Sequence, residues 1–183
     1  MARIPYFDPA GATGLAKKAY ARLPGLNIFR MLGHSGDMIE PFTRLGNAIL
    51  AFSELDQVLR EIAIIRVGVL SGASYEVYQH ENIARRYGMS DELISAIHQG
   101  PQAIAFDDVQ RAVMYFTDDV VKNVRASDVT FKPLERHLSP RQLQELTITI
   151  GYYMMVSRFL ETFDVDIEEA GSKAAVKLPG MKD

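Results

Sequence analysis

The sequence has no cysteine among its 183 residues. Without thiols a chain cannot form disulfides, thiolate metal sites, a cysteine nucleophile or a redox thiol pair. Disulfide-stabilised domains, cysteine-ligated zinc proteins and thiol-dependent enzymes are therefore excluded at the outset. The absence of cysteine does not indicate the cellular compartment, because such a chain folds equally well in reducing and oxidising surroundings.

Long apolar runs and basic clusters are missing as well. No apolar run approaches the roughly 20 residues that a membrane-spanning helix needs. The N-terminus has Pro5 and Asp8 where a signal peptide requires an apolar core. The net charge is −3 and the 20 basic residues are spread along the chain, whereas nucleic-acid binders usually carry a basic stripe. We therefore predict a soluble cytoplasmic protein that binds neither membranes nor nucleic acid.

The composition is that of an ordinary globular protein, with 48% hydrophobic and 23% charged residues. The length suits one domain with a single core. We predict one domain over residues 1–183, with its core at about 20–165. The small and polar residues at about 171–183 predict a tail that is mobile or pinned to a neighbouring subunit.

Apolar residues recur at helical spacing between turn signals, and no segment reads as a strand or hairpin. Asp37 and Ser139 are expected to cap helices, and Pro140 suits a first helical position. The segment 126–137 reads as turn-rich. The sequence therefore predicts an all-α fold. Its helices are expected at about 9–23, 28–32, 37–52, 55–70, 74–87, 90–99, 107–121 and 139–160.

The residues best suited to chemistry lie between Glu61 and His80. Glu61 interrupts an aliphatic run, and burial would raise the pKa of its carboxyl group toward neutrality. Glu76 and His80 are four residues apart and face the same way on a helix, with Tyr75 beside them. If residues 55–70 and 74–87 form a helical hairpin, these carboxylates, the imidazole and the phenol line one pocket. Such a set is suited to proton transfer.

The same residues could instead have purely structural roles. An arginine could hold Glu61 in a buried ion pair, and an i,i+4 Glu–His pair is often only a solvated helix face. Arg66 interrupts the same apolar run, five residues after Glu61, so the two are not i,i+4 partners. No metal site is expected, because Glu76 and His80 supply two ligands without a third. No phosphate loop or serine elbow is present, and no cofactor is predicted. The remaining histidines are expected to be structural: His34, His98 and His137.

Several segments are similar to one known family. They are EIAIIRV at 61–67, SGASYEVYQH at 71–80, IAR at 83–85 and GMSDE at 88–92, with weaker similarity at 27–32 and 152–159. Together they resemble the carboxymuconolactone decarboxylase family, whose superfamily includes the alkylhydroperoxidase D proteins. The resemblance covers about residues 20–165. It implies an all-helical fold built around a central helical hairpin and assembled as homotrimers or homohexamers.

The peroxidase branch of this family has the pattern E-x11-C-x2-C-x3-H. Glu61 matches the glutamate and His80 the histidine, but Ala73 and Glu76 stand at the two cysteine positions. Thiol peroxidase chemistry proceeds through a sulfenic acid, which neither alanine nor glutamate can form. The resemblance therefore identifies a cysteine-less member that is not a thiol peroxidase.

The decarboxylase branch works without redox cysteines or a bound cofactor. Similarity to it implies a carboxy-lyase or isomerase acting on a small carboxylated or lactone substrate. Glu61 and His80 would relay the proton with Glu76 or Tyr75 nearby. Arg66 or Arg85 would hold a substrate carboxylate. The alternative is a non-enzymatic oligomer that lost its thiols and binds a small molecule or a partner.

Overall fold

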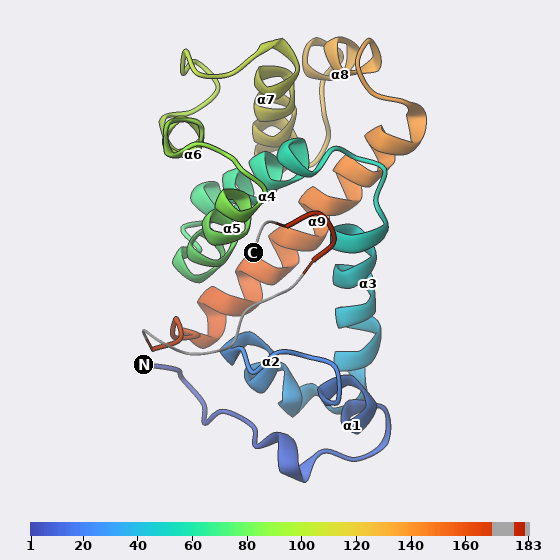
Figure 1. Ribbon diagram of the computed structural model, residues 1–183, viewed down its shortest axis with the longest axis vertical. Helices are drawn as coiled ribbons and strands as arrows, with labels where there is room; N and C mark the ends of the chain where they lie inside the picture. Colours follow the sequence, from blue (N-terminus) through green and yellow to red (C-terminus); the bar gives the residue numbers. More distant parts are fainter. Residues whose placement is uncertain (170–177, 182–183) are drawn as a thin grey trace.

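The computed structural model describes residues 1–169 and 178–181, and every regular element in these ranges is helical. The long helix α9 crosses the centre of the molecule, with α4 and α5 beside it. Helices α6, α7 and α8 lie at one end, and α1 and α2 lie at the other (Figure 1). The predicted all-α fold is confirmed. The elements are η1 (Pro9–Gly11), α1 (Gly14–Tyr20), α2 (Asn27–Leu32), η2 (Gly33–Met38), α3 (Ile39–Phe52), α4 (Gln57–Ser71), α5 (Ser74–Arg86), α6 (Asp91–Gln99), α7 (Asp108–Asn123), α8 (Asp128–Glu135) and α9 (Pro140–Phe163).

Helix α4 is the core of the fold and packs against α5, α7 and α9. Asp56 caps it, and its carboxylate accepts hydrogen bonds from the backbone N–H groups of Val58 and Leu59. Every residue from 59 to 68 is buried. The helix is therefore buried around its whole circumference, as expected of a helix enclosed by others.

Helices α4 and α5 form the predicted hairpin around residues 71–72. Gly72 ends α4 with φ +67°, a left-handed conformation that glycine adopts without a Cβ penalty. Gly68 allows the close approach of the two helices, since a Cβ there would lie 2.9 Å from the Val77 side chain. This contact sets α5 directly against α4 and brings the residues of both helices together.

Helix α9 begins where its sequence predicts. Pro140 occupies the first turn, and Ser139 and Gln142 form a capping box in which each side chain bonds the other's backbone N–H. The helix then runs along α4 and also contacts α5 and α7. It thereby covers the hairpin on one side and brings Tyr153 into the core.

Three local predictions were wrong. Segment 126–137 contains helix α8 rather than only turns, and Pro133 lies inside that helix. The predicted helix at 9–23 is split into η1 and α1, and Gly14, the first residue of α1, has φ +54°. Asp37 does not cap α3. Its carboxylate instead accepts hydrogen bonds from the N–H groups of Leu15 and Ala16, at the start of α1.

The predicted tail lies mostly outside the described residues, which there include only 178–181. Within that piece, Gly180 lies close to the side chain of Gln57 at the start of α4. In the part of the chain that the structure describes, no helix is both long enough and apolar enough to cross a membrane.

Candidate active site

The hairpin brings three of the predicted site residues into one line. Glu61 on α4 lies 2.7 Å from His80 on α5, measured from Oε2 to Nδ1. Glu76, one turn before His80, lies 3.1 Å from the other ring nitrogen, measured from Oε1 to Nε2. The exposed fractions are 0% for Glu61, 4% for Glu76 and 5% for His80. The imidazole therefore bridges two buried carboxylates.

This environment sets the charge of His80. Burial by itself would lower the pKa of the imidazole, but the charges and hydrogen bonds of Glu61 and Glu76 outweigh it and raise the pKa to about 9. At neutral pH the ring is therefore an imidazolium that donates one N–H to each carboxylate. Tyr153 packs edge-on against the ring, with 4.8 Å between the ring centroids.

A fourth charged side chain completes the cluster. Arg60 is 3% exposed, and its Nε lies 3.5 Å from Glu61 Oε1. Its guanidinium also donates to the Tyr87 hydroxyl at 3.3 Å. Two buried cations thus balance two buried carboxylates. We call Arg60, Glu61, Glu76 and His80 the buried relay.

Two atoms of the buried relay are left without a hydrogen-bond partner among the described residues. They are Arg60 Nε and Glu61 Oε1, which face each other. An arginine does hold Glu61, as the structural alternative anticipated, but by charge at 3.5 Å rather than through a hydrogen bond. Unsatisfied buried polar atoms are uncommon, and they recur at functional sites.

A cleft of about 280 Å³ reaches the buried relay at Arg60. It lies where α3 ends and α4 begins. Arg60 and Tyr87 line it on the side of the buried relay. Leu50, Ala51, Ser53, Leu55, Asp56, Gln57 and Pro179 form the rest of its lining.

Tyr75 and Ala73 lie beside the buried relay but not in its hydrogen-bonded line. The Tyr75 hydroxyl donates to Glu168 at 2.6 Å, and its ring is 2% exposed. Ala73 is fully buried at the start of α5, where its backbone N–H donates to the Gly68 carbonyl. Glu76 stands at the second position where the peroxidase pattern has a cysteine, and its carboxylate faces His80 there.

The structure engages Arg66 and Arg85 elsewhere. Arg66 forms a two-pronged ion pair with Asp118 on α7, at 2.6 and 2.8 Å. It also donates to the backbone carbonyl of Ile97. Arg85 pairs with Asp91 and with Glu81. A role of either arginine in substrate binding would require it to leave these partners.

The sequence interpretation missed Arg60, Tyr153 and Glu168. Arg60 had a visible signal, since it directly precedes Glu61 at the start of the apolar run. Among residues 1–169 and 178–181, no group of three His, Cys, Asp or Glu side chains is arranged to hold a metal ion. Two of the remaining histidines have protein partners: His34 Nε2 lies 2.6 Å from the Pro5 carbonyl, and His98 lies 2.7 Å from Glu81.

The sequence matches one family model. Residues 37–119 match the model described as the carboxymuconolactone decarboxylase family, and this segment includes all four residues of the buried relay. No curated protein sequence matches the chain significantly.

Solved structures share the fold at low sequence identity. A peroxidase-related protein from Ralstonia eutropha, described as an alkylhydroperoxidase AhpD core, is 17% identical with a TM-score of 0.79; the match covers 92% of this chain and 93% of that one. A protein of unknown function from Agrobacterium tumefaciens is 21% identical with a TM-score of 0.68, over 72% of this chain and 91% of that one. The debrominase Bmp8, solved as a cysteine-to-alanine variant in complex with 2,3,4-tribromopyrrole, is 21% identical with a TM-score of 0.70. The match covers 85% of this chain and 83% of that one.

Proposed function

We propose that this chain, which has no cysteine and whose residues 37–119 match the model of the carboxymuconolactone decarboxylase family, is a cofactor-free enzyme that transfers a proton on a small carboxylated or lactone substrate. A decarboxylase or an isomerase fits this description. The observation that carries the proposal is the buried relay, in which an imidazolium bridges two buried carboxylates.

The energetics of burial support a functional role. Taking four charged groups out of water is costly, and well-packed apolar residues in their place are often neutral or stabilising. A buried ionic cluster is therefore weak evidence for stability alone.

The relay supplies a proton in two balanced steps. The imidazolium of His80 passes its Nε2 proton to Glu76, which leaves a neutral ring still bonded through Nδ1–H to the Glu61 carboxylate. Glu76, now a carboxylic acid, donates this proton to the substrate carbanion that remains after carbon dioxide leaves. Glu61 stabilises the charged ring and fixes its orientation, as a carboxylate partner does for a catalytic histidine.

Loss of the Glu61 charge tests this function. A screen of lactone acids and β-keto acids for release of carbon dioxide or isomerisation first identifies a turned-over substrate. We expect Glu61→Gln to lower its kcat at least 100-fold, because the neutral amide no longer stabilises the imidazolium that supplies the proton, and a positioned acid–base group contributes about 10²–10⁴. Glu54→Gln removes an exposed carboxylate and is the matched control, with turnover like the wild type.

Full activity in Glu61→Gln contradicts the proposal. Absence of turnover across the screen, in a folded wild-type protein, also contradicts it and favours the second candidate. Turnover of organic hydroperoxides through a thiol mechanism would overturn the exclusion of peroxidase chemistry, which follows from the absence of cysteine.

The second candidate is a non-enzymatic binding protein of the same fold. One observation favours it: all four residues of the buried relay are at most 5% exposed, and both ring nitrogens of His80 already face carboxylates. In that case the buried relay is a closed structural cluster, and the cleft beside Arg60 is the ligand site. Ligand binding without turnover distinguishes this candidate from the first.

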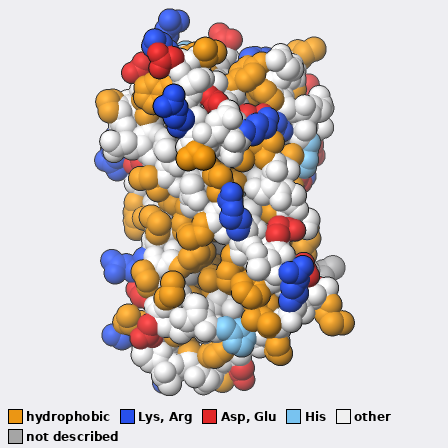
Figure 2. Space-filling view, turned by 180° about the vertical axis from the view of Figure 1, so that it is seen from behind, with side chains coloured by type: hydrophobic (Ala, Val, Ile, Leu, Met, Phe, Trp, Pro, Cys, Tyr) orange, Lys and Arg blue, Asp and Glu red, His pale blue; other side chains and the backbone are white. Residues whose placement is uncertain are grey.

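We also propose that the chain assembles as a homotrimer or homohexamer. Met38, Leu45 and Phe52 are 44–71% exposed and recur every seven residues along α3 and the turn before it. Ile148 and Met155 repeat this spacing on α9. A seven-residue repeat puts apolar side chains on one helix face, as helix association requires. Figure 2 shows apolar side chains gathered across the middle of the rear face.

The expected result is a trimer or hexamer in light scattering at micromolar concentration. Phe52→Glu should shift the mass toward the monomer, because it puts a charge into an apolar contact. Val124→Glu is the matched control, since Val124 is 89% exposed at the end of α7. A monomeric wild type, or equal effects of both changes, contradicts the assembly.

A further inference from the structure

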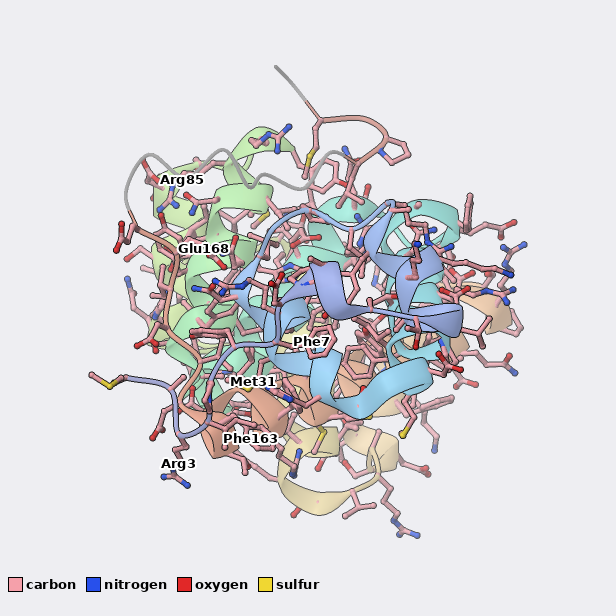
Figure 3. The ribbon with its side chains drawn as sticks, turned by 90° about the horizontal axis from the view of Figure 1, so that it is seen from below. Arg3, Phe7, Met31, Arg85, Phe163 and Glu168 are labelled. Carbon is pink, nitrogen blue, oxygen red and sulfur yellow. The ribbon has the colours of Figure 1, made fainter. Side chains whose placement is uncertain are left out.

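The chain that follows α9 is tied down along the N-terminal segment. The Arg3 backbone N–H donates to the Phe163 carbonyl, and its guanidinium pairs with Asp164 at 2.8 Å. Asp166 accepts hydrogen bonds from the Ala2 N–H and the Tyr6 hydroxyl. We call residues 164–169 the C-terminal strap. It leads from the end of α9 to α5, where Glu168 lies (Figure 3).

Glu168 ends in a cradle of three hydrogen-bond donors. Its Oε1 accepts from the Asn27 backbone N–H at 2.7 Å and from the Tyr75 hydroxyl at 2.6 Å. Its Oε2 accepts from the Gln79 side-chain amide at 2.5 Å. The donors come from α2 and α5, while the carboxylate comes from a segment that starts after α9. We call Asn27 N–H, Tyr75 and Gln79 the carboxylate cradle.

The carboxylate cradle is a built site rather than a surface contact. Tyr75 is 2% exposed, so its hydroxyl needs a partner. Burial raises the pKa of Tyr75, and the hydrogen bond to Glu168 and the charge of Glu76 raise it further, so the phenol remains a donor at neutral pH. All three groups donate to one carboxylate group, two of them to Oε1 and one to Oε2. Hydrogen bonds to an ionised acceptor are stronger than those between neutral groups, so the set favours a carboxylate.

The carboxylate cradle adjoins the buried relay. Tyr75 directly precedes Glu76, and Gln79 directly precedes His80, so two neighbouring stripes of α5 carry the two sets of side chains. A carboxylic acid held in the carboxylate cradle would therefore lie against the same helix that carries the proposed proton donor.

We propose that Asn27, Tyr75 and Gln79 form a binding site for the carboxylate of a small organic acid, and that Glu168 occupies it as an internal ligand. A substrate acid displaces Glu168 and the end of the C-terminal strap. This site would bind a substrate carboxylate without Arg66 or Arg85, which are already paired with acidic side chains. The catalytic consequence rests on the proposed function, while the binding site does not.

Removal of the internal ligand tests the site directly. Glu168→Ala deletes one CH2 group and the carboxylate, which together have the size of acetate. We therefore titrate sodium acetate into ¹⁵N-labelled protein, at constant ionic strength set with sodium chloride, and follow the Asn27 amide signal. We expect the variant to bind acetate at least tenfold more tightly than the wild type, with a saturable shift of that signal.

Two further variants make the result specific. Glu169→Ala removes the neighbouring exposed carboxylate and should bind acetate no better than the wild type. Addition of Gln79→Ala to Glu168→Ala should weaken acetate binding at least fivefold. If Glu168→Ala does not fold, Glu168→Gln keeps the side-chain volume, removes the charge, and should show the same direction of change. Equal acetate binding in the wild type and the Glu168 variant, or binding unaffected by Gln79→Ala, overturns the proposal.

The failure of this site and of the proposed function are distinguishable. Acetate binding is read without any turnover. Tight binding to Glu168→Ala together with full activity of Glu61→Gln would support the carboxylate cradle and overturn the buried relay. Absence of acetate binding to Glu168→Ala together with loss of activity in Glu61→Gln would overturn the carboxylate cradle and support the buried relay.

Discussion

Replacement of His80 with alanine is expected to lower the free energy of unfolding by about 3–5 kcal/mol, the range for breaking a buried ion pair from one side. The imidazolium is the positive group to which both Glu61 and Glu76 are hydrogen-bonded. Without it two carboxylates stay buried, and Arg60 contacts only one of them, at 3.5 Å. The cavity left by the imidazole ring adds to this loss.

Urea denaturation of the two proteins measures this difference, and His98→Ala is the matched control. His98 also lies 2.7 Å from a glutamate, Glu81, but its side chain is 44% exposed. Water screens such a pair, so its removal should cost about 0–1 kcal/mol. The two variants differ mainly in the burial of the pair. A loss below about 1 kcal/mol in His80→Ala would mean that the carboxylates are neutral or solvated without the imidazole.

Local sequence patterns were sufficient for most of the helices. Gly72 and Ser139 mark helix ends through backbone geometry and capping, which depend on a few neighbouring residues. Helix α8 was missed because Pro133 argues against a helix interior. Asp37 was assigned to the wrong helix because a carboxylate can cap any N-terminus that the fold brings near, and α1 lies 21 residues away in the chain.

The candidate site was predictable to the extent that its residues share one hairpin. Glu61, Glu76 and His80 follow from the spacing within α4 and α5 and from the family resemblance. Glu168 was not predictable in this way. It meets Tyr75 across 93 residues, and its partner Gln79 across 89, through a segment without regular secondary structure. Helical periodicity carries no information about such a contact.

The stability of the wild-type protein is expected to fall as the pH rises from about 6.5 to about 9. The folded state raises the pKa of His80 from 6.5 to about 9. Between these values the folded protein holds a proton that the unfolded chain has released, so each increase in pH favours unfolding. The stabilising contribution is fully present below pH 6.5 and is lost as the pH passes through about 9. At 1.36 kcal/mol for each pKa unit, the loss is on the order of 3 kcal/mol.

Urea denaturation at several values between about pH 6 and about pH 9.5 measures this loss. His80→Gln should remove the slope, while His98→Ala should keep it. The phenols of Tyr152 and Tyr153 add little to the slope below about pH 9, because an unperturbed tyrosine has a pKa of about 10. Burial, joined by the charge of Glu76, raises the pKa of Tyr153 and of Tyr152, so both phenols stay neutral. Equal slopes in the wild type and His80→Gln would mean that the ring is neutral in the folded protein. The buried relay would then have no imidazolium proton to pass to Glu76, and the proposed mechanism would fail at its first step.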